Sequence, residues 1–146
     1  MEQIDLQIVQ LLAADGRMSF TDLGRATGLS TSAVHQRVKR LEKRGIIRGY
    51  RAVVDHELVG LPLTAFVSIT PIDPSEADDY PERLRDIAEI ESCWSVAGEE
   101  SYILKVRVLK PRKLEDLLAR IRSAANVSTR TTIVLSTAYE DRPLAL

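Results

Sequence analysis

Cysteine and histidine are scarce in this sequence of 146 residues, and their scarcity excludes several kinds of site. The single cysteine, Cys93, cannot form a disulfide within the chain or supply a cysteine cluster for zinc. The two histidines, His35 and His56, stand in no HExxH motif, and no GxSxG motif accompanies them. We therefore expect no hydrolytic triad, no metal and no cofactor. The neighbouring acids Asp78 and Asp79 are interpreted as a solvated helix start.

Long hydrophobic runs are also absent. No stretch reaches the roughly 18 consecutive apolar residues of a membrane-spanning helix. The first residues, MEQIDLQ, carry acids and no basic segment, which is not the pattern of a signal peptide. Together with the lone cysteine, these features predict a cytoplasmic protein. The hydrophobic fraction of 45% and the charged fraction of 28% are typical of a folded chain.

The net charge of −1 conceals an uneven distribution. Residues 1–55 hold nine Lys or Arg against six Asp or Glu, whereas residues 56–146 hold eleven against fifteen. Residues 35–51 alone contain seven basic residues and one acid, Glu42. A local basic patch on a nearly neutral protein indicates a polyanion partner, although a solvated helix face gives the same run of charges.

Two helices are predicted in the first 28 residues. Apolar residues at helical spacing mark a helix over residues 4–13, which Asp15 and Gly16 end. Ser19 begins a second helix over residues 20–27, and Gly28 closes it in the left-handed conformation. The side chains of this second helix that are predicted to point inward are Phe20, Leu23 and Ala26.

A third helix is predicted from Ser30 or Thr31 to Arg44, with Gly45 at its end. Three apolar residues share one face of it: Val34, Val38 and Leu41. Two short helices, a turn with glycine and a longer polar helix predict a helix-turn-helix, whose second helix fits the major groove of DNA, about 12 Å wide. A helical trio that binds protein instead of DNA is the alternative.

Polar residues on the other faces of the third helix are the candidate DNA contacts. Serine, threonine and glutamine side chains contact base edges, and arginine and lysine reach bases or phosphates. The predicted DNA-binding residues are Arg17, Thr31, Ser32, His35, Gln36, Arg37, Lys39 and Arg40. The flanking Lys43 and Arg44 are expected to reach phosphates too. After this helix, the β-prone residues 46–55 predict a hairpin, or wing, and residues 56–62 a linker.

The remaining sequence alternates between strand and helix patterns. The predicted elements are strands at 63–70, 90–97, 102–108 and 127–137 and helices at 76–88 and 111–126. The order β-α-β-β-α-β is typical of a ferredoxin-like domain. We therefore predict an α+β protein with an N-terminal winged helix-turn-helix DNA-binding domain over residues 1–55 and a C-terminal ferredoxin-like domain over residues 63–146.

Both helices of such a domain cover one face of its sheet, so the other face meets water or a partner. Apolar candidates for that second face are Phe66, Trp94 and Val106. We expect a homodimer formed through it. Lys105 and Arg107 are expected on the outer face of their strand, and Cys93 as a small core residue.

The turn from Gly98 to Tyr102 is a second candidate site. A glycine in a turn between strands exposes backbone N–H and C=O groups, and Glu99 and Glu100 stand beside it. Such a turn suits the carboxylate and ammonium groups of an amino acid. An ordinary hairpin is the alternative.

Several stretches of the chain together resemble the Lrp/AsnC, or feast/famine, family of transcriptional regulators. These stretches are Asp5-x-x-Ile8-x-x-Leu11, then Asp15-Gly16-Arg17, then LSTSAVHQRVKRLEKRGIIRGYRAVVD from Leu29 to Asp55, and the turn at Gly98 with the strand after it. The resemblance implies a winged helix-turn-helix that reads double-stranded DNA. It also implies a C-terminal domain that dimerises, assembles into octamers or similar forms, and binds amino acids or related metabolites.

The same resemblance implies an effector site near the glycine turn. The effector-binding residues that it implies are Gly98, Glu99, Glu100, Ser101, Tyr102 and Thr131; Thr129 and Thr132 are further candidates from a neighbouring subunit. Many members carry aspartate where this chain has Ser101, and the preceding glutamates are expected to replace it. Two other functions stay open: a tetrapyrrole (siroheme-type) decarboxylase of similar architecture, and a regulator that needs no effector.

Overall fold

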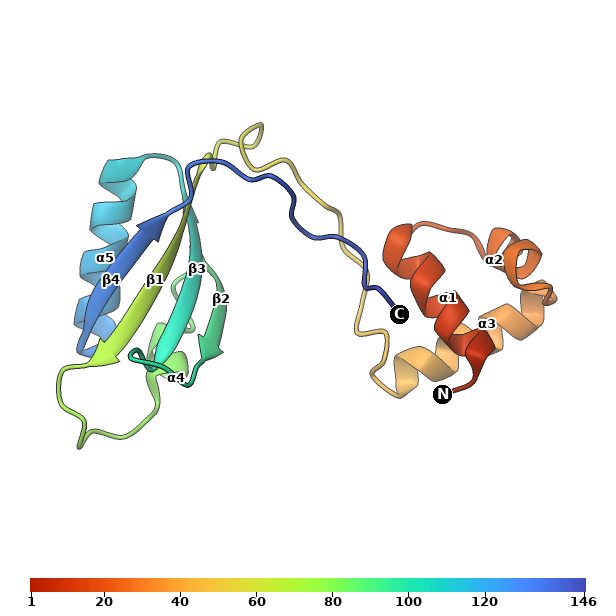
Figure 1. The fold of residues 1–146 in the computed structure, drawn as a ribbon, viewed down its shortest axis with the longest axis horizontal. Coiled ribbons are helices and arrows are strands. Elements are labelled where there is room, and N and C mark those ends of the chain that lie inside the picture. Colours follow the sequence, from red (N-terminus) through yellow and green to blue (C-terminus); the bar gives the residue numbers. More distant parts are fainter. The chain divides into compact units, whose positions relative to one another are not determined.

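The computed structural model describes residues 1–146 and consists of two compact units. A helical unit comprises Met1–Val53 together with Ala138–Leu146, and a sheet unit comprises Val54–Thr137. Figure 1 shows the elements of each unit. None of the helices is long and apolar enough to cross a membrane.

Three helices form the helical unit, as the sequence predicts: α1 (Gln3–Ala14), α2 (Phe20–Thr27) and α3 (Thr31–Lys43). The Oγ atoms of Ser19 and Ser30 cap α2 and α3 by accepting backbone N–H groups from the residues three positions on. Gly28 ends α2 with φ of 73°, a conformation that favours glycine. The core of the unit consists of Ile8, Leu12, Leu23, Val34, Val38 and Leu41.

Three details of this unit differ from the prediction. Phe20 and Ala26 are exposed, because α2 has only eight residues and buries Leu23 and Gly24 instead. The hairpin wing is absent, since no strand lies between α3 and residue 63. The N–H groups of Ile46 and Ile47 both bond to the carbonyl of Leu41, so these residues close α3 and pack on the helical core.

The last residues of the chain lie against α1. Leu144 lines a cavity with Val9, Leu12 and Ile46, among others. The Nε2 atom of Gln10 donates a hydrogen bond to the backbone oxygen of Leu146. These contacts explain why the C-terminal residues belong to the helical unit.

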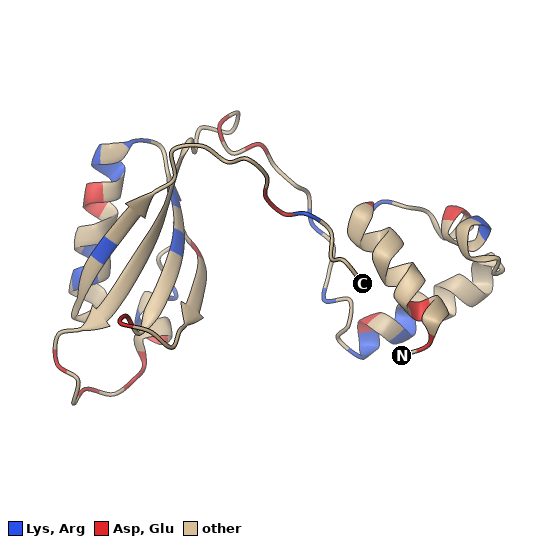
Figure 2. Cartoon of the chain, in the orientation of Figure 1, with Lys and Arg blue, Asp and Glu red and all other residues tan.

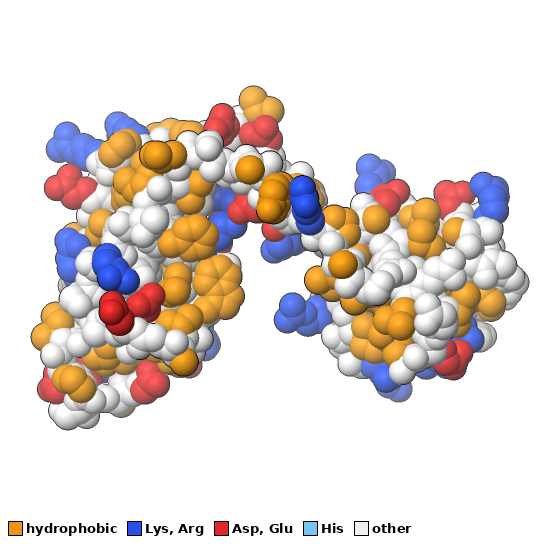
Figure 3. All heavy atoms as spheres, viewed as in Figure 1, with side chains coloured by type: hydrophobic (Ala, Val, Ile, Leu, Met, Phe, Trp, Pro, Cys, Tyr) orange, Lys and Arg blue, Asp and Glu red, His pale blue; other side chains and the backbone are white.

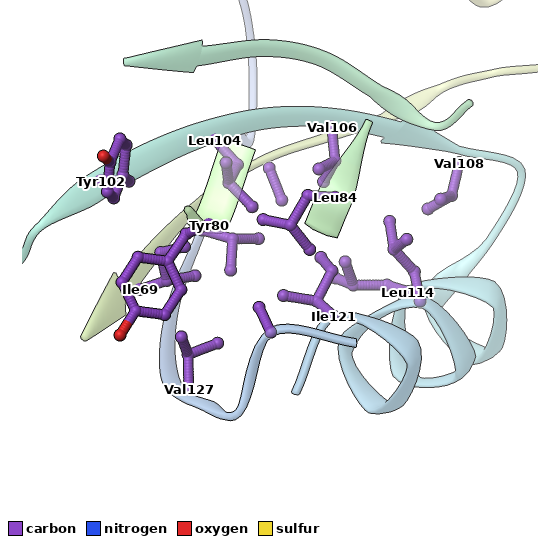
Figure 4. Close-up of a cluster of buried hydrophobic side chains, with 14 residues drawn as sticks. Ile69, Tyr80, Leu84, Tyr102, Leu104, Val106, Val108, Leu114, Ile121 and Val127 are labelled. Atoms are coloured by element: carbon purple, nitrogen blue, oxygen red, sulfur yellow. The ribbon is translucent and has the colours of Figure 1, made fainter. Parts of the chain in front are cut away.

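Four antiparallel strands and two helices form the sheet unit. The strands are β1 (Leu63–Pro71), β2 (Ile90–Ser95), β3 (Tyr102–Val108) and β4 (Val127–Ile133), in the spatial order β2-β3-β1-β4. The helices α4 (Tyr80–Leu84) and α5 (Pro111–Ala125) pack on the same face. This is the predicted ferredoxin-like arrangement. Figure 4 shows the core, in which Leu104 and Val106 of β3 face Leu84, Leu114 and Ile121 of the helices.

Two elements of the sheet unit, α4 and β4, are at least four residues shorter than predicted. Helix α4 begins only at Tyr80, because Asp73 holds Ser75 in a local turn and Pro81 lacks the N–H needed in a helix interior. Strand β4 ends at Ile133, since its partner β1 begins at Leu63 and the last bond between them joins the N–H of Val134 to Thr64. The residues beyond that point have no partner strand.

The face of the sheet opposite the helices carries no helix or strand of this unit. Trp94 is 46% exposed on this face, beside partly buried Ile103, its partner on β3. Figure 3 shows hydrophobic side chains on this face next to a group of acidic and basic side chains. Phe66 lies here as predicted, but Val106 does not, because it is fully buried beneath the helices.

Two polar residues of the sheet differ from the prediction in their surroundings. Arg107 lies on the open face yet is only 4% exposed, since its Nε donates to Thr64 Oγ1 at 3.1 Å and lies 3.6 Å from Glu91. Cys93 is exposed rather than buried, because β2 is an edge strand and the short α4 does not cover it. Partial burial of its thiol nevertheless raises the pKa of Cys93.

Candidate nucleic-acid interface and polar pocket

Helix α3 has a buried stripe and a solvent-facing stripe. Val34, Val38 and Leu41 are buried against α1 and α2. Because each helical residue turns by about 100°, the opposite side carries a second row. That row consists of the exposed residues Ser32, Gln36, Lys39 and Lys43. It presents a hydroxyl, an amide and two ammonium groups, the donors and acceptors that read base edges and phosphates.

Two other predicted DNA-contact residues flank this stripe. Thr31 is exposed in the first turn of α3, and His35 packs on Phe20 of α2 with 5.1 Å between the ring centroids. The contact holds the imidazole at the junction of the two helices. The same contact explains why an aromatic residue stands at position 20, outside the core.

Arg37 differs from its neighbours because acidic groups of the same unit hold it. Its Nη1 donates to Asp5 Oδ1 at 2.8 Å and to Glu2 Oε2 at 2.9 Å. Arg40, one turn further along, places its Nη2 3.6 Å from Asp5 Oδ2. The hydrogen bonds that Arg37 donates to Asp5, and secondly to Glu2, raise the pKa of Arg37. Figure 2 shows basic residues along the C-terminal half of α3 beside acidic residues at the start of α1.

Arg17 and the residues at the end of α3 complete the basic surface. The side chain of Arg17 is exposed just before α2, while its backbone N–H donates to Asp15. Lys43 and Arg44 are exposed where α3 ends. Tyr50 donates a hydrogen bond to Glu42. Partial burial of the hydroxyl, and to a lesser extent this bond, raise the pKa of Tyr50 to about 12.

Gly24 is a residue that sequence reasoning missed. A Cβ atom on Gly24 would lie 2.6 Å from the carbonyl oxygen of Leu29, in the turn between α2 and α3. The N–H of Leu29 donates to the carbonyl of Gly24 at 3.0 Å. The absence of a side chain therefore lets the turn close on α2. Its only sequence signal is a glycine inside a helix, which is unfavourable without such a packing reason.

The sheet unit has a polar pocket of about 160 Å³ on the open face and edge of its sheet. Its lining residues are Ser68, Thr70, Glu99, Glu100, Ser128, Thr129 and Arg130. Glu100 accepts a hydrogen bond from Ser68 at 3.3 Å, and Arg130 lies 3.7 Å from both glutamates. The pocket thus places one guanidinium beside two carboxylates.

The other residues expected in the effector site do not line this pocket. Tyr102 is buried at the margin of the core, and its hydroxyl donates to Asp78 at 2.8 Å, a bond that raises the pKa of Tyr102. Thr131 pairs with the buried Val67, which places it on the helix side of the sheet. Gly98 neighbours Glu100, while Ser101 bonds through its backbone to Ile69 and Val96.

The acidic pair that the sequence suggests is a solvated helix start has defined partners. Asp78 accepts the hydroxyl of Tyr102, and Asp79 forms an ion pair with Arg83 at 2.8 Å. Both therefore fasten the loop before α4. No group of three or more His, Cys, Asp or Glu is placed to hold a metal ion.

Each of the two units matches a known protein domain. Residues 1–42 match the AsnC-type helix-turn-helix domain, and residues 64–144 match the Lrp/AsnC ligand binding domain. The HTH-type transcriptional regulator LrpA of Mycobacterium tuberculosis is 58% identical over 142 residues, or 97% of this chain and 95% of that protein. LrpC of Bacillus subtilis is 33% identical over 129 residues, or 88% of this chain and 89% of its own.

A solved structure shows the same likeness. The feast or famine regulatory protein of M. tuberculosis complexed with L-methionine superposes with a TM-score of 0.96 at 57% identity. The match covers 98% of this chain and 97% of that one.

Proposed function

Because the chain belongs to the Lrp/AsnC family of DNA-binding transcriptional regulators, we propose that its α3 reads a specific DNA sequence and that its polar pocket takes an amino acid. Its relatives are transcriptional regulators, and this chain is likewise a regulator rather than an enzyme. The decarboxylase alternative therefore does not apply. The observation that carries the DNA proposal is the exposed row of Ser32, Gln36, Lys39 and Lys43 opposite the buried side of α3.

Each residue of that row has a proposed role. Gln36 stands near its middle, and its amide suits the N6 and N7 atoms of adenine. Ser32 and Thr31 lie in the first turn of α3, the part of a recognition helix that contacts base edges. Lys39 and Lys43, with Arg17 and Arg44, supply positive charge for phosphates.

Gln36→Ala is expected to weaken binding to the specific site by roughly 1–3 kcal/mol, because a bidentate contact to one base is lost. Gel shifts with a genomic promoter fragment and with random DNA measure the two affinities. Gln3→Ala, which changes an exposed glutamine at the start of α1, is the matched control and should change neither. An equal loss on both DNAs would make Gln36 a phosphate contact.

A second copy of the chain is proposed to cover the open face of the sheet. The support is the exposed Trp94 beside Ile103 and Phe66 on a face that no element of its own unit covers. Two-fold pairing through this face presents two α3 helices. Footprints of the protein on its promoter should then show half-sites one helical turn, or multiples of it, apart.

The pocket of the sheet unit supports an amino acid as effector. Arg130 can bind a carboxylate, and Glu100 and Glu99 can bind an ammonium group, each through charge-assisted hydrogen bonds. Glu100 is largely buried, at 18% exposure, so its charge is screened less than a surface charge. The related M. tuberculosis protein was solved with L-methionine, which makes this amino acid the first to test.

L-methionine at one hundred times its dissociation constant should stabilise the folded protein by about 2.7 kcal/mol, because it binds only the native state. Thermal unfolding with and without the ligand measures the shift. Arg130→Gln should abolish most of it, whereas Arg112→Gln, an exposed arginine of α5, should not. If none of the twenty amino acids raises the midpoint, the protein needs no such effector. Equal losses in the two variants would place the site elsewhere.

A further inference from the structure

We infer that Arg37 is a positioning residue of α3 rather than a DNA contact, and that Asp5 of α1 holds it in that role. The inference rests on the DNA-binding function proposed for α3. Arg37 lies in the basic stretch of the sequence, and its type alone suggests a phosphate contact. Its partners in the structure assign it differently.

The two ends of the interaction differ in their access to solvent. The side chain of Asp5 is 3% exposed, whereas that of Arg37 is 23% exposed and that of Glu2 is 62% exposed. A buried carboxylate needs an opposite charge and hydrogen-bond donors, because water does not reach it. Arg37 at 2.8 Å supplies both, while Arg40, at 3.6 Å and beyond hydrogen-bond distance, contributes charge alone.

A DNA phosphate would therefore have to take Arg37 from a carboxylate that solvent cannot compensate. Lys39 has no such constraint, because it is exposed and lies about 160° round the helix from Arg37. The basic residues of α3 therefore have two different roles. Arg37 and, in part, Arg40 anchor the helix to α1, and Lys39 and Lys43 face solvent.

The anchor sets the rotation of α3 about its own axis. Apolar contacts such as those of the buried stripe are non-directional, whereas the Arg37–Asp5 bond joins two defined atoms on different helices. Hydrogen bonds weaken steeply with distance and angle, so this bond resists rotation. The orientation of Gln36 and Lys39 toward a duplex follows from it.

The salt dependence of DNA binding separates the two roles. Each phosphate contact adds about 0.9 to the slope of log affinity against log salt concentration. The probe is a duplex that the wild-type full chain selects from a random-sequence library. We expect Lys39→Gln to lower the slope by about one contact and Arg37→Gln to leave it unchanged, while Arg37→Gln still weakens specific binding about tenfold or more.

Circular dichroism at the assay temperature checks that each variant is folded. If Arg37→Gln unfolds, the double variant Asp5→Asn/Arg37→Gln, which leaves no buried charge, takes its place with the same expectations. A slope lowered in either variant to the level of Lys39→Gln would show that Arg37 contacts phosphate and overturn the inference. Unchanged slope and unchanged specific affinity in a folded variant would show a purely structural pair and overturn it too. If the wild-type chain selects no sequence, the proposed function itself fails.

Discussion

Asp5→Asn is expected to lower the free energy of unfolding of the helical unit by about 2–3 kcal/mol. Loss of a hydrogen bond to a charged group costs roughly 1.5–3 kcal/mol, and breaking a fully buried ion pair roughly 3–5 kcal/mol. The lower range applies because Arg37 keeps Glu2 as a partner and reaches solvent. Asparagine fills the same space as aspartate, so no cavity adds to the effect.

Thermal or urea unfolding of the full chain measures this loss, and a fall in the midpoint on the order of 10 °C or more is expected for a unit of this size. Glu2→Gln is the matched control. It removes a negative charge that pairs with the same arginine, but this carboxylate is largely exposed. The free energy of unfolding should therefore fall by less than about 1 kcal/mol. Equal effects of the two changes would mean that the burial of Asp5 contributes nothing.

Gly24→Ala is expected to destabilise the helical unit by about 1–2 kcal/mol and to weaken specific DNA binding at least tenfold. The new methyl group would lie 2.6 Å from a backbone oxygen, which cannot rotate away as a side chain can. Overpacking of this kind costs roughly 1–3 kcal/mol, and the better helix propensity of alanine, up to about 1 kcal/mol, offsets part of it. DNA binding suffers because the displaced turn leads directly into α3.

Gly16→Ala provides the comparison. A Cβ atom at Gly16 would meet its nearest neighbours at 3.8 Å, an ordinary contact, so stability should change by no more than about 0.5 kcal/mol. Unfolding and gel-shift measurements on both variants test the pair. Wild-type stability in Gly24→Ala would contradict the close approach of the turn to α2.

Local signals in the sequence predict most of the helical unit and fewer of its contacts. The caps at Ser19 and Ser30 and the spacing of Val34, Val38 and Leu41 act within one helix, so they are legible in the chain. The sequence also predicts the position of Arg37 at the border of the buried stripe, because Arg37 falls three residues after Val34. The sequence does not predict that Asp5 is the partner of Arg37, because 32 residues separate the two.

The candidate effector site shows the same division. The turn after Gly98 and the alternation of β3 are local signals, and they predict the turn that carries Glu99 and Glu100. The face on which Thr131 lies depends on the register of β4 against β1, and a shift of one residue in register exchanges the faces. Arg130, which reaches both glutamates, follows from that register and could not be predicted from the sequence.

The helical unit is discontinuous along the chain, with Ala138–Leu146 as its second segment. On the ribosome, α1 to α3 emerge before the sheet unit, whereas the residues that lie against Val9 and Gln10 emerge after it. The helical unit is therefore completed only after the sheet unit has been translated. For the same reason, an affinity tag fused after Leu146 adjoins the helical unit, and a tag at the N-terminus does so as well.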